Sequence, residues 1–150
     1  MRHFAFVSND DRDRLFLRAP EAFGLDDDPE LLGAALGATL YCPATRTNLA
    51  DDIVRRTGDG MVSVVVCLED AVADEQLLSA EANAIAQLRQ LSDCDVELPM
   101  IFIRVRAATQ IPMILDGLGP ATSVLAGFVV PKFTEEIGRA SCRERVSYHV

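Results

Sequence analysis

Short apolar runs alternate with helix-like stretches from residue 36 to residue 130 of this chain. The run at 61–68 is the strongest strand signal, because only Ser63 interrupts it and continuous β-branched runs are typical of parallel strands buried on both faces. We expect strands at 38–42, 61–68, 100–106 and 127–130, and helices at 48–57, 74–91 and 110–118. Strands that alternate with helices form βαβ units, which predicts an α/β fold with a parallel sheet.

The longest predicted helix, at 74–91, has one apolar stripe. Its large aliphatic residues recur at intervals of seven and three, at Leu78, Ile85, Leu88 and Leu91. Residues 1–35 are by contrast polar, acidic and irregular, apart from a short helix that Pro29 can begin. We expect residues 1–35 to form an N-terminal extension that covers one mouth of the domain.

Two architectures fit this order of elements, a doubly wound sheet and a (β/α)8 barrel. A doubly wound nucleotide-binding sheet would carry GxGxxG after its first strand, but residues 42–46 contain no glycine. The GxxxxGK[ST] motif of phosphate-binding loops is also absent from the sequence. The pattern therefore favours the N-terminal half of a TIM barrel, with about four βα units in a partial barrel domain at 36–135.

Composition and charge argue against several classes of partner. The 150 residues have a formal net charge of −9, whereas nucleic-acid binding needs clustered Lys and Arg. No apolar run reaches the ~18 residues of a membrane span, and the N-terminus lacks the features of a signal peptide. The four cysteines form no CxxC pair and the two histidines lie near opposite ends, so we expect reduced thiols in the cytoplasm and no histidine-based metal motif.

Charged residues follow each apolar run that we assign to a strand. In a parallel barrel the active site lies at the carboxyl ends of the strands, so these residues are expected on one rim. They are Arg46 after the first run, Glu69 and Asp70 after the second, Arg104 and Arg106 at the end of the third, and Lys132 after the fourth. Cations suit a carboxylated or phosphorylated substrate and paired acids suit a divalent metal, so the rim predicts this chemistry.

Each of these residues also has a purely structural interpretation. Glu69 and Asp70 could cap the helix that follows, because acids are favoured at helix N-termini. Arg104 and Arg106, which share one face of the strand, could be salt-bridge partners in the barrel core or exposed edge charges. Lys132 could be a solvated loop residue. The residues alone leave both interpretations open.

Four segments resemble the family of the citrate lyase β-subunit, malyl-CoA lyase and HpcH/HpaI aldolase. Residues 65–72 resemble its DLEDAV strand end, residues 102–106 its VRVN strand, residues 129–132 its LPK strand end and residues 40–46 its opening LFVPG segment. They occur in the family's order and together cover residues 36–134. The residues at 1–4 and 38–46 are similar to a branch of bacterial C–C bond lyases of the TIM-barrel fold that accompany tellurium-resistance and stress-response gene clusters.

The resemblance implies an enzyme that makes or breaks a C–C bond next to a carbonyl, in which Mg²⁺ stabilises the enolate of a 2-oxo acid or acyl-CoA-like substrate. It implies that Arg104 binds the substrate carboxylate or oxo group and that Lys132 lies at the pocket rim. It also implies that Glu69 and Asp70 are catalytic acids that contact the metal through water. The family's direct metal ligands lie on strands five and six, so we expect none in this chain.

Three departures from the family motifs alter the expected site. Cys67 replaces the first aspartate of DLED, and Ala44 replaces the glycine of LFVPG, which restricts close approach of a phosphate or CoA group. Arg106 replaces the asparagine of VRVN and adds a cation. We expect Arg106, together with Arg46, to help bind a small carboxylated substrate whose charge differs from that of a CoA thioester.

The family pattern stops after residue 135. Residues 136–146 resemble the translation of a common sequencing adapter, so we expect 136–150 to be a non-native tail; the alternative is a divergent basic helix. We expect this chain to be a truncated lyase that is inactive alone, and the full-length enzyme to be a homo-oligomer. A non-catalytic binding or assembly protein on the same scaffold, in a stress-response system, is the second hypothesis. A half-barrel that pairs with a second copy is the third.

Overall fold

The computed structural model describes residues 1–132 and places four parallel strands in one sheet. The strands are β1 (Leu40–Pro43), β2 (Ser63–Cys67), β3 (Met100–Arg104) and β4 (Leu125–Val129), and they lie side by side in that order. A doubly wound sheet reverses its strand order about a switch point, whereas the neighbours here follow one another along the chain. The order therefore confirms an α/β fold consistent with a partial TIM barrel.

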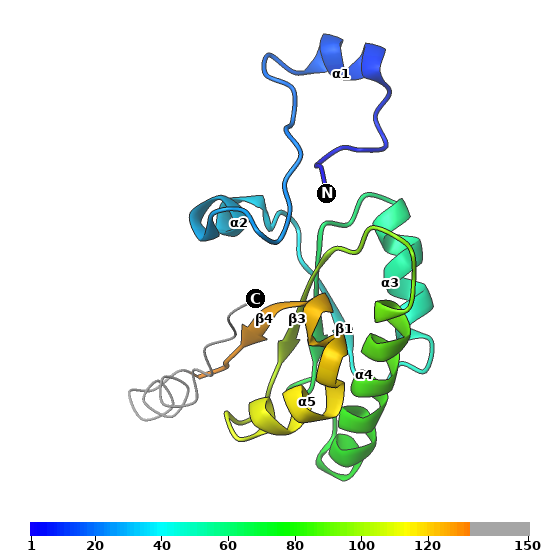
Figure 1. Cartoon of the computed structure of the whole chain (residues 1–150), viewed down its shortest axis with the longest axis vertical. Helices are drawn as coiled ribbons and strands as arrows, with labels where there is room; N and C mark the ends of the chain where they lie inside the picture. The colour runs from blue at the N-terminus through cyan, green and yellow to red at the C-terminus, as the bar shows by residue number, and fades with distance from the viewer. Residues whose placement is uncertain (133–150) are drawn as a thin grey trace.

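Three helices connect the strands and cover one face of the sheet (Figure 1). They are α3 (Leu49–Gly58), α4 (Leu77–Ser92) and α5 (Gln110–Leu118), and α4 packs between the other two. The 3-10 turns η1 (Asp74–Gln76) and η2 (Gly119–Val124) precede α4 and β4. Helices on a single face are the arrangement of a barrel, in which the opposite face of the sheet points to the interior.

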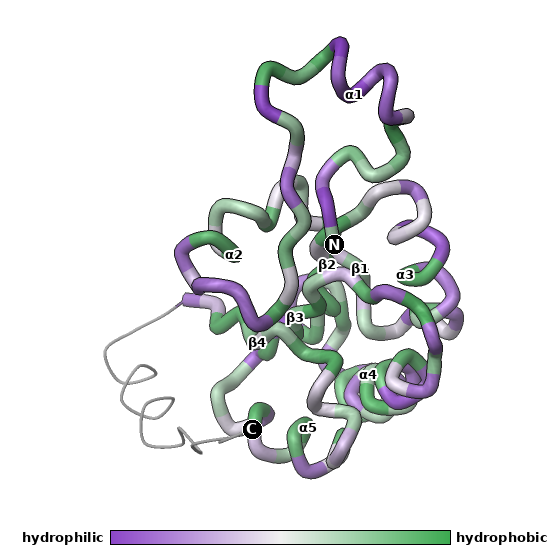
Figure 2. Tube along the Cα trace, turned by 45° about the horizontal axis from the view of Figure 1, so that its top comes forward, coloured by the Kyte–Doolittle hydropathy of each residue, from purple (hydrophilic) through white to green (hydrophobic). Residues whose placement is uncertain are grey.

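The hydrophobic core lies between the sheet and these helices. Val64 and Val66 of β2 lie beside Ile101 and Ile103 of β3 on the helix side, and all four are fully buried. Figure 2 shows hydrophobic stretches along β3 and β4 and hydrophilic ones along the N-terminal helix. Burying each such side chain stabilises the fold by roughly 1.5–3 kcal/mol. None of the helices within residues 1–132 combines the length and the hydropathy that a membrane crossing needs.

The buried face of α4 differs from the predicted stripe. Leu88 and Leu91 are buried and Ile85 packs against the core, as expected, but Leu78 is 81% exposed. The face that meets the core contains Ala80 and Ala84, and Leu77 packs there in place of Leu78. Each residue turns a helix by about 100°, so Leu77 and Leu78 point in very different directions. The prediction for Leu78 was wrong because Leu77 and Leu78 both fit the helical spacing of the later leucines. The sequence alone does not decide which of the two faces the core.

The N-terminal extension contains one helix that the sequence pattern did not predict. This helix, α1 (Asn9–Leu15), begins after Ser8, whose Oγ accepts a hydrogen bond from Asp11 N at 3.1 Å, and it buries no residue. It projects away from the sheet (Figure 1). The second helix, α2 (Pro29–Ala35), begins at Pro29, where the sequence places a helix start, and lies over the amino ends of the strands.

A register shift divides β4. Phe102 pairs with Gly127 rather than with Ala126, so Ala126 is an extra residue in β4. Beyond the shift, Val129 lies beside Arg104. An extra residue of this kind is a β-bulge, which changes the face to which the following side chains point.

Candidate active site

Four of the charged residues predicted from the strand ends meet at the carboxyl edge of the sheet. Arg104, the last residue of β3, forms ion pairs with Glu69 and Asp70, and its Nη2 lies 2.8 Å from Asp70 Oδ2. Lys132 Nζ lies 3.0 Å from Glu69 Oε1. The cluster of Glu69, Asp70, Arg104 and Lys132 therefore joins the ends of β2, β3 and β4.

Glu69 is the buried member of this cluster. It is 7% exposed, whereas the side chains of Asp70 and Lys132 are 67% and 82% exposed. Its Oε1 faces Lys132, and its buried Oε2 forms an ion pair with Arg104. Burying an unpaired carboxylate is costly, and the two cations offset that cost.

Arg104 is the central cation of the cluster. Desolvation by burial lowers the pKa of Arg104, but the charges of Glu69 and Asp70, together with the hydrogen bond to Asp70, outweigh it and raise the pKa above its ordinary value. In the sheet register Arg104 pairs with Cys67, a buried free thiol. The site thus contains a permanently charged, planar donor beside a small apolar residue where the family motif has a carboxylate.

The interpretation of Glu69 and Asp70 as helix caps is wrong. The first helical turn after β2 is η1, and Ala73 precedes it as the N-cap residue. Glu69 and Asp70 lie earlier, in the loop between β2 and η1, where both carboxylates face Arg104. They are therefore placed by the strand end and not by the helix.

Arg106 contacts the same loop but in a different way. Its guanidinium forms an ion pair with Asp74 and donates hydrogen bonds to the main-chain carbonyls of Glu69, at 3.2 Å, and Val72. Substrate binding by Arg106 stays a prediction, although its donors already engage groups of the chain. Sequence reasoning missed Asp74 as a partner, and the only signal for it is an acid in a first helical turn.

The structure does not bring Arg46 into the cluster. Its guanidinium pairs with Asp52 of α3 at 2.6 Å, and Asp52 also accepts a hydrogen bond from Arg55 at 2.7 Å. The hydrogen bond from Arg55 is the main cause of a lowered pKa of Asp52; desolvation opposes the shift and Arg46 adds to it. Arg46 therefore has a local structural partner on the β1 side of the sheet.

The described residues do not form a complete magnesium site. Residues 1–132 contain no group of three or more His, Cys, Asp or Glu side chains placed to hold an ion. Glu69 and Asp70 supply two carboxylates, and each already faces a cation. Because both carboxylates are already paired with cations, these two residues do not fit a direct Mg²⁺ site by themselves.

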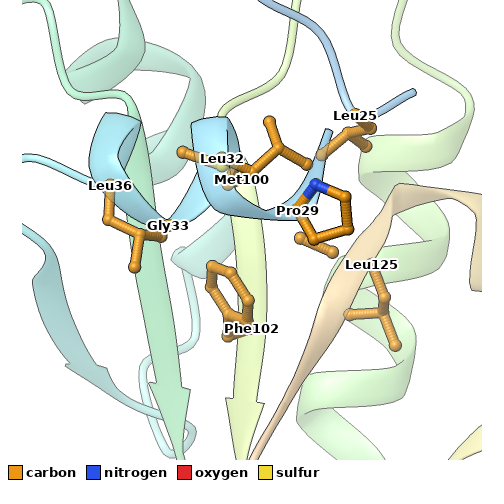
Figure 3. A pocket seen from close by; sticks show the side chains of 9 residues that line it. Leu25, Pro29, Leu32, Gly33, Leu36, Met100, Phe102 and Leu125 are labelled. Atoms are coloured by element: carbon orange, nitrogen blue, oxygen red, sulfur yellow. The ribbon is translucent and has the colours of Figure 1, made fainter. Parts of the chain in front are cut away.

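An apolar hollow of about 420 Å³ lies at the other end of the sheet (Figure 3). Its lining includes Leu32 and Leu36 of the α2 region and Met100, Phe102 and Leu125 of the strands, and contains no charged residue. Barrel enzymes carry their active sites at the carboxyl ends of the strands. The charged cluster, and not this hollow, is therefore the candidate active site.

A parallel sheet with sequential strands, helices on one face and charged residues at the carboxyl ends has the architecture of barrel-type α/β enzymes. Residues 30–149 match the family described as C–C bond lyase of the TIM-barrel fold. The chain belongs to this family. No curated protein and no solved structure matched the chain. The matched range includes 136–149, most of the expected non-native tail, which lies outside the described residues.

Proposed function

We propose that this chain carries the carboxylate-binding part of a C–C bond lyase active site, in which Arg104 binds the carboxylate or oxo group of the substrate. The observation that carries this proposal is the pairing of Arg104 with one buried and one exposed acid at the end of β3. Membership in the C–C bond lyase family supports the reaction class. The substrate class that we propose is a small 2-oxo acid or acyl-CoA-like compound, to which a guanidinium offers two parallel donors.

Asp70 occupies the position that a substrate carboxylate would take. Its side chain is largely exposed, and it accepts a hydrogen bond from Arg104 Nη2. Exposed ion pairs contribute only about 0–1 kcal/mol, so a carboxylate that binds Arg104 through two parallel hydrogen bonds can displace Asp70 at small cost. Glu69, which is buried, would stay in place and hold Arg104 oriented.

The cluster also suits the electron movements of an aldol-type cleavage. In such a cleavage a hydroxyl proton passes to a base, the C–C bond breaks, and the electron pair moves onto the adjoining carbonyl as an enolate. Arg104 and Lys132 would stabilise the negative charge on the enolate oxygen. Glu69, the buried acid of the cluster, is the group that we propose to accept the proton.

Binding of oxalate, a small dicarboxylate, tests this proposal by isothermal titration calorimetry. Arg104→Lys should weaken binding at least about tenfold, because an ammonium cannot form the two parallel hydrogen bonds of a guanidinium. Arg89→Gln is the matched control, since Arg89 is an exposed arginine of α4, and it should bind oxalate like the wild type. Equal affinity of the wild type and Arg104→Lys would contradict the proposal.

A cleavage assay separates the two functional classes. The described residues form one wall of a site, so we propose that the chain binds a carboxylated ligand without turning it over. Measurable cleavage of a 2-oxo acid or acyl-CoA by the chain would contradict that expectation and support an active lyase. Oxalate binding without any turnover would favour the non-catalytic binding protein.

We propose further that the chain assembles with a second copy and acts in the cytoplasm. Among residues 1–132, β1 and β4 are edge strands paired on one side only, and unpaired edges favour association. Cys42 and Cys67 are free, buried thiols, as is usual in a reducing compartment. Light scattering coupled to gel filtration tests the assembly, and a monomer at micromolar concentration would contradict it. The link to tellurium-resistance gene clusters rests on the sequence resemblance.

A further inference from the structure

The loop that carries Glu69 is held by two arginines, one at the end of β3 and one in the loop after it, through two kinds of contact. Arg104 contacts its carboxylates, whereas Arg106 donates hydrogen bonds to its main-chain carbonyls at Glu69 and Val72. The Glu69 carbonyl also accepts a hydrogen bond from Val72 N at 3.0 Å, so Arg106 closes the turn that begins at Glu69. A displacement of Arg106 would therefore move the backbone from which the Glu69 carboxylate projects.

Arg106 is itself fixed by a buried pair of side chains from α4 and α5. Gln110 Oε1 accepts hydrogen bonds from the main-chain N–H groups of Arg106 and Ala107, the latter at 3.0 Å. Gln110 Nε2 donates to Glu81 Oε1, and both side chains are buried. Buried polar side chains are costly unless they are paired, so the Glu81–Gln110 pair holds the start of the loop after β3 in one position.

We propose that Arg106 is a positioning residue for Glu69 and not a ligand of the substrate. A guanidinium has five N–H donors, and those of Arg106 meet three acceptors of the chain itself. Two of these acceptors are main-chain carbonyls, which cannot swing away as the exposed Asp70 carboxylate can. Arg104 then recognises the substrate, Glu69 orients Arg104, and Arg106 sets where Glu69 lies. The inference rests on the proposed function, because it needs Glu69 and Arg104 to form the site.

A double-mutant cycle with oxalate as the probe tests whether Arg106 acts through Glu69. Arg106→Gln should weaken oxalate binding about fivefold in the wild-type background and should have no effect in a Glu69→Gln background. Arg106→Lys keeps the charge but cannot reach all three acceptors. Its affinity for oxalate should therefore lie between those of the wild type and Arg106→Gln. The same loss in both backgrounds, or no loss in the wild-type background, would overturn the proposal.

Amide hydrogen exchange without ligand distinguishes failure of this inference from failure of the proposed function. Arg106→Gln should speed exchange of the Val72 amide, whose hydrogen bond closes the turn at Glu69. Glu75→Gln is the control, since Glu75 is a neighbouring exposed acid, and it should leave that exchange unchanged. If the wild type does not bind oxalate but exchange still rises, the proposed function is wrong and Arg106 still positions the loop. If the Val72 amide of Arg106→Gln exchanges at the wild-type rate, the positioning role is wrong, whether or not the chain binds oxalate.

Discussion

Lys132 and Glu69 connect two strands that do not pair with each other. Nζ of Lys132 lies 3.0 Å from Oε1 of Glu69, although β3 lies between β2 and β4 in the sheet. Lys132 has a φ of 49°, in the left-handed region that residues other than glycine seldom adopt. Backbone strain of this kind is concentrated at functional sites, which supports a role for Lys132 in the cluster.

The two cations that face Glu69 should differ in their effect on stability. Lys132→Gln should lower the free energy of unfolding by about 0.5 kcal/mol, because Lys132 is largely exposed. Arg104→Gln should lower it by about 2 kcal/mol, because a buried carboxylate is left with one exposed partner. Urea unfolding followed by circular dichroism measures both values. Equal losses would mean that Glu69 does not depend mainly on Arg104.

Asp52 should stabilise the β1 side of the sheet only above strongly acidic pH. Its pKa is lowered in the folded chain, chiefly by the hydrogen bond from Arg55. This contribution is therefore present above the unfolded-state pKa of about 3.9 and is lost as the pH falls through the folded-state pKa. In an NMR titration of the Asp52 carboxyl group, Arg55→Gln should move the midpoint up toward the ordinary value. An unchanged midpoint would show that Arg55 is not the main cause.

Cys42 should resist alkylation in the folded chain. Desolvation by burial raises the pKa of the Cys42 thiol, although Arg46 opposes this. Its contribution to stability is therefore present below the unfolded-state pKa of about 8.5 and is lost as the pH rises through the folded-state pKa. Iodoacetamide at mildly alkaline pH should modify the exposed Cys94 before the buried Cys42, as peptide mass spectrometry would show. Equal rates at Cys42 and Cys94 would contradict the burial of Cys42.

Two leucines of α4 should respond very differently to the same substitution. Leu88→Ala should cost about 2–5 kcal/mol, because the removed atoms leave a cavity in a close-packed core. Leu78→Ala should change stability by less than about 0.5 kcal/mol, because Leu78 projects into solvent. Thermal and urea unfolding of the two variants provides the comparison. A large loss for Leu78→Ala would restore the stripe that the sequence spacing suggested.

The sheet could be predicted from the sequence because its strands are continuous apolar runs. The helix at 110–118 coincides with α5, and the run at 61–68 contains β2. The helix α1 was missed because it buries no residue and so has no apolar period to detect. The strand β4 begins at Leu125, before the predicted start at 127, because the bulge at Ala126 interrupts the regular pattern.

The meeting of Glu69, Arg104 and Lys132 could be predicted because parallel strands bring their carboxyl ends to one edge. The directions of Arg46 and Arg106 could not. Beyond the end of a strand, alternation no longer decides where a side chain points, and nearby acceptors decide instead. For Arg46 that acceptor is Asp52, and for Arg106 it is the loop that begins at Glu69.

The bulge at Ala126 determines which side of the sheet the later side chains of β4 point to. In an uninterrupted ladder Phe128 would lie opposite Arg104, and an aromatic ring would border the charged cluster. With the bulge, Val129 takes that place and Phe128 packs against the helices. Loss of Ala126 would leave the later pairing intact, whereas loss of one residue between Gly127 and Lys132 would turn the strand end over. The segment after the bulge is therefore where the chain has least freedom to change its length.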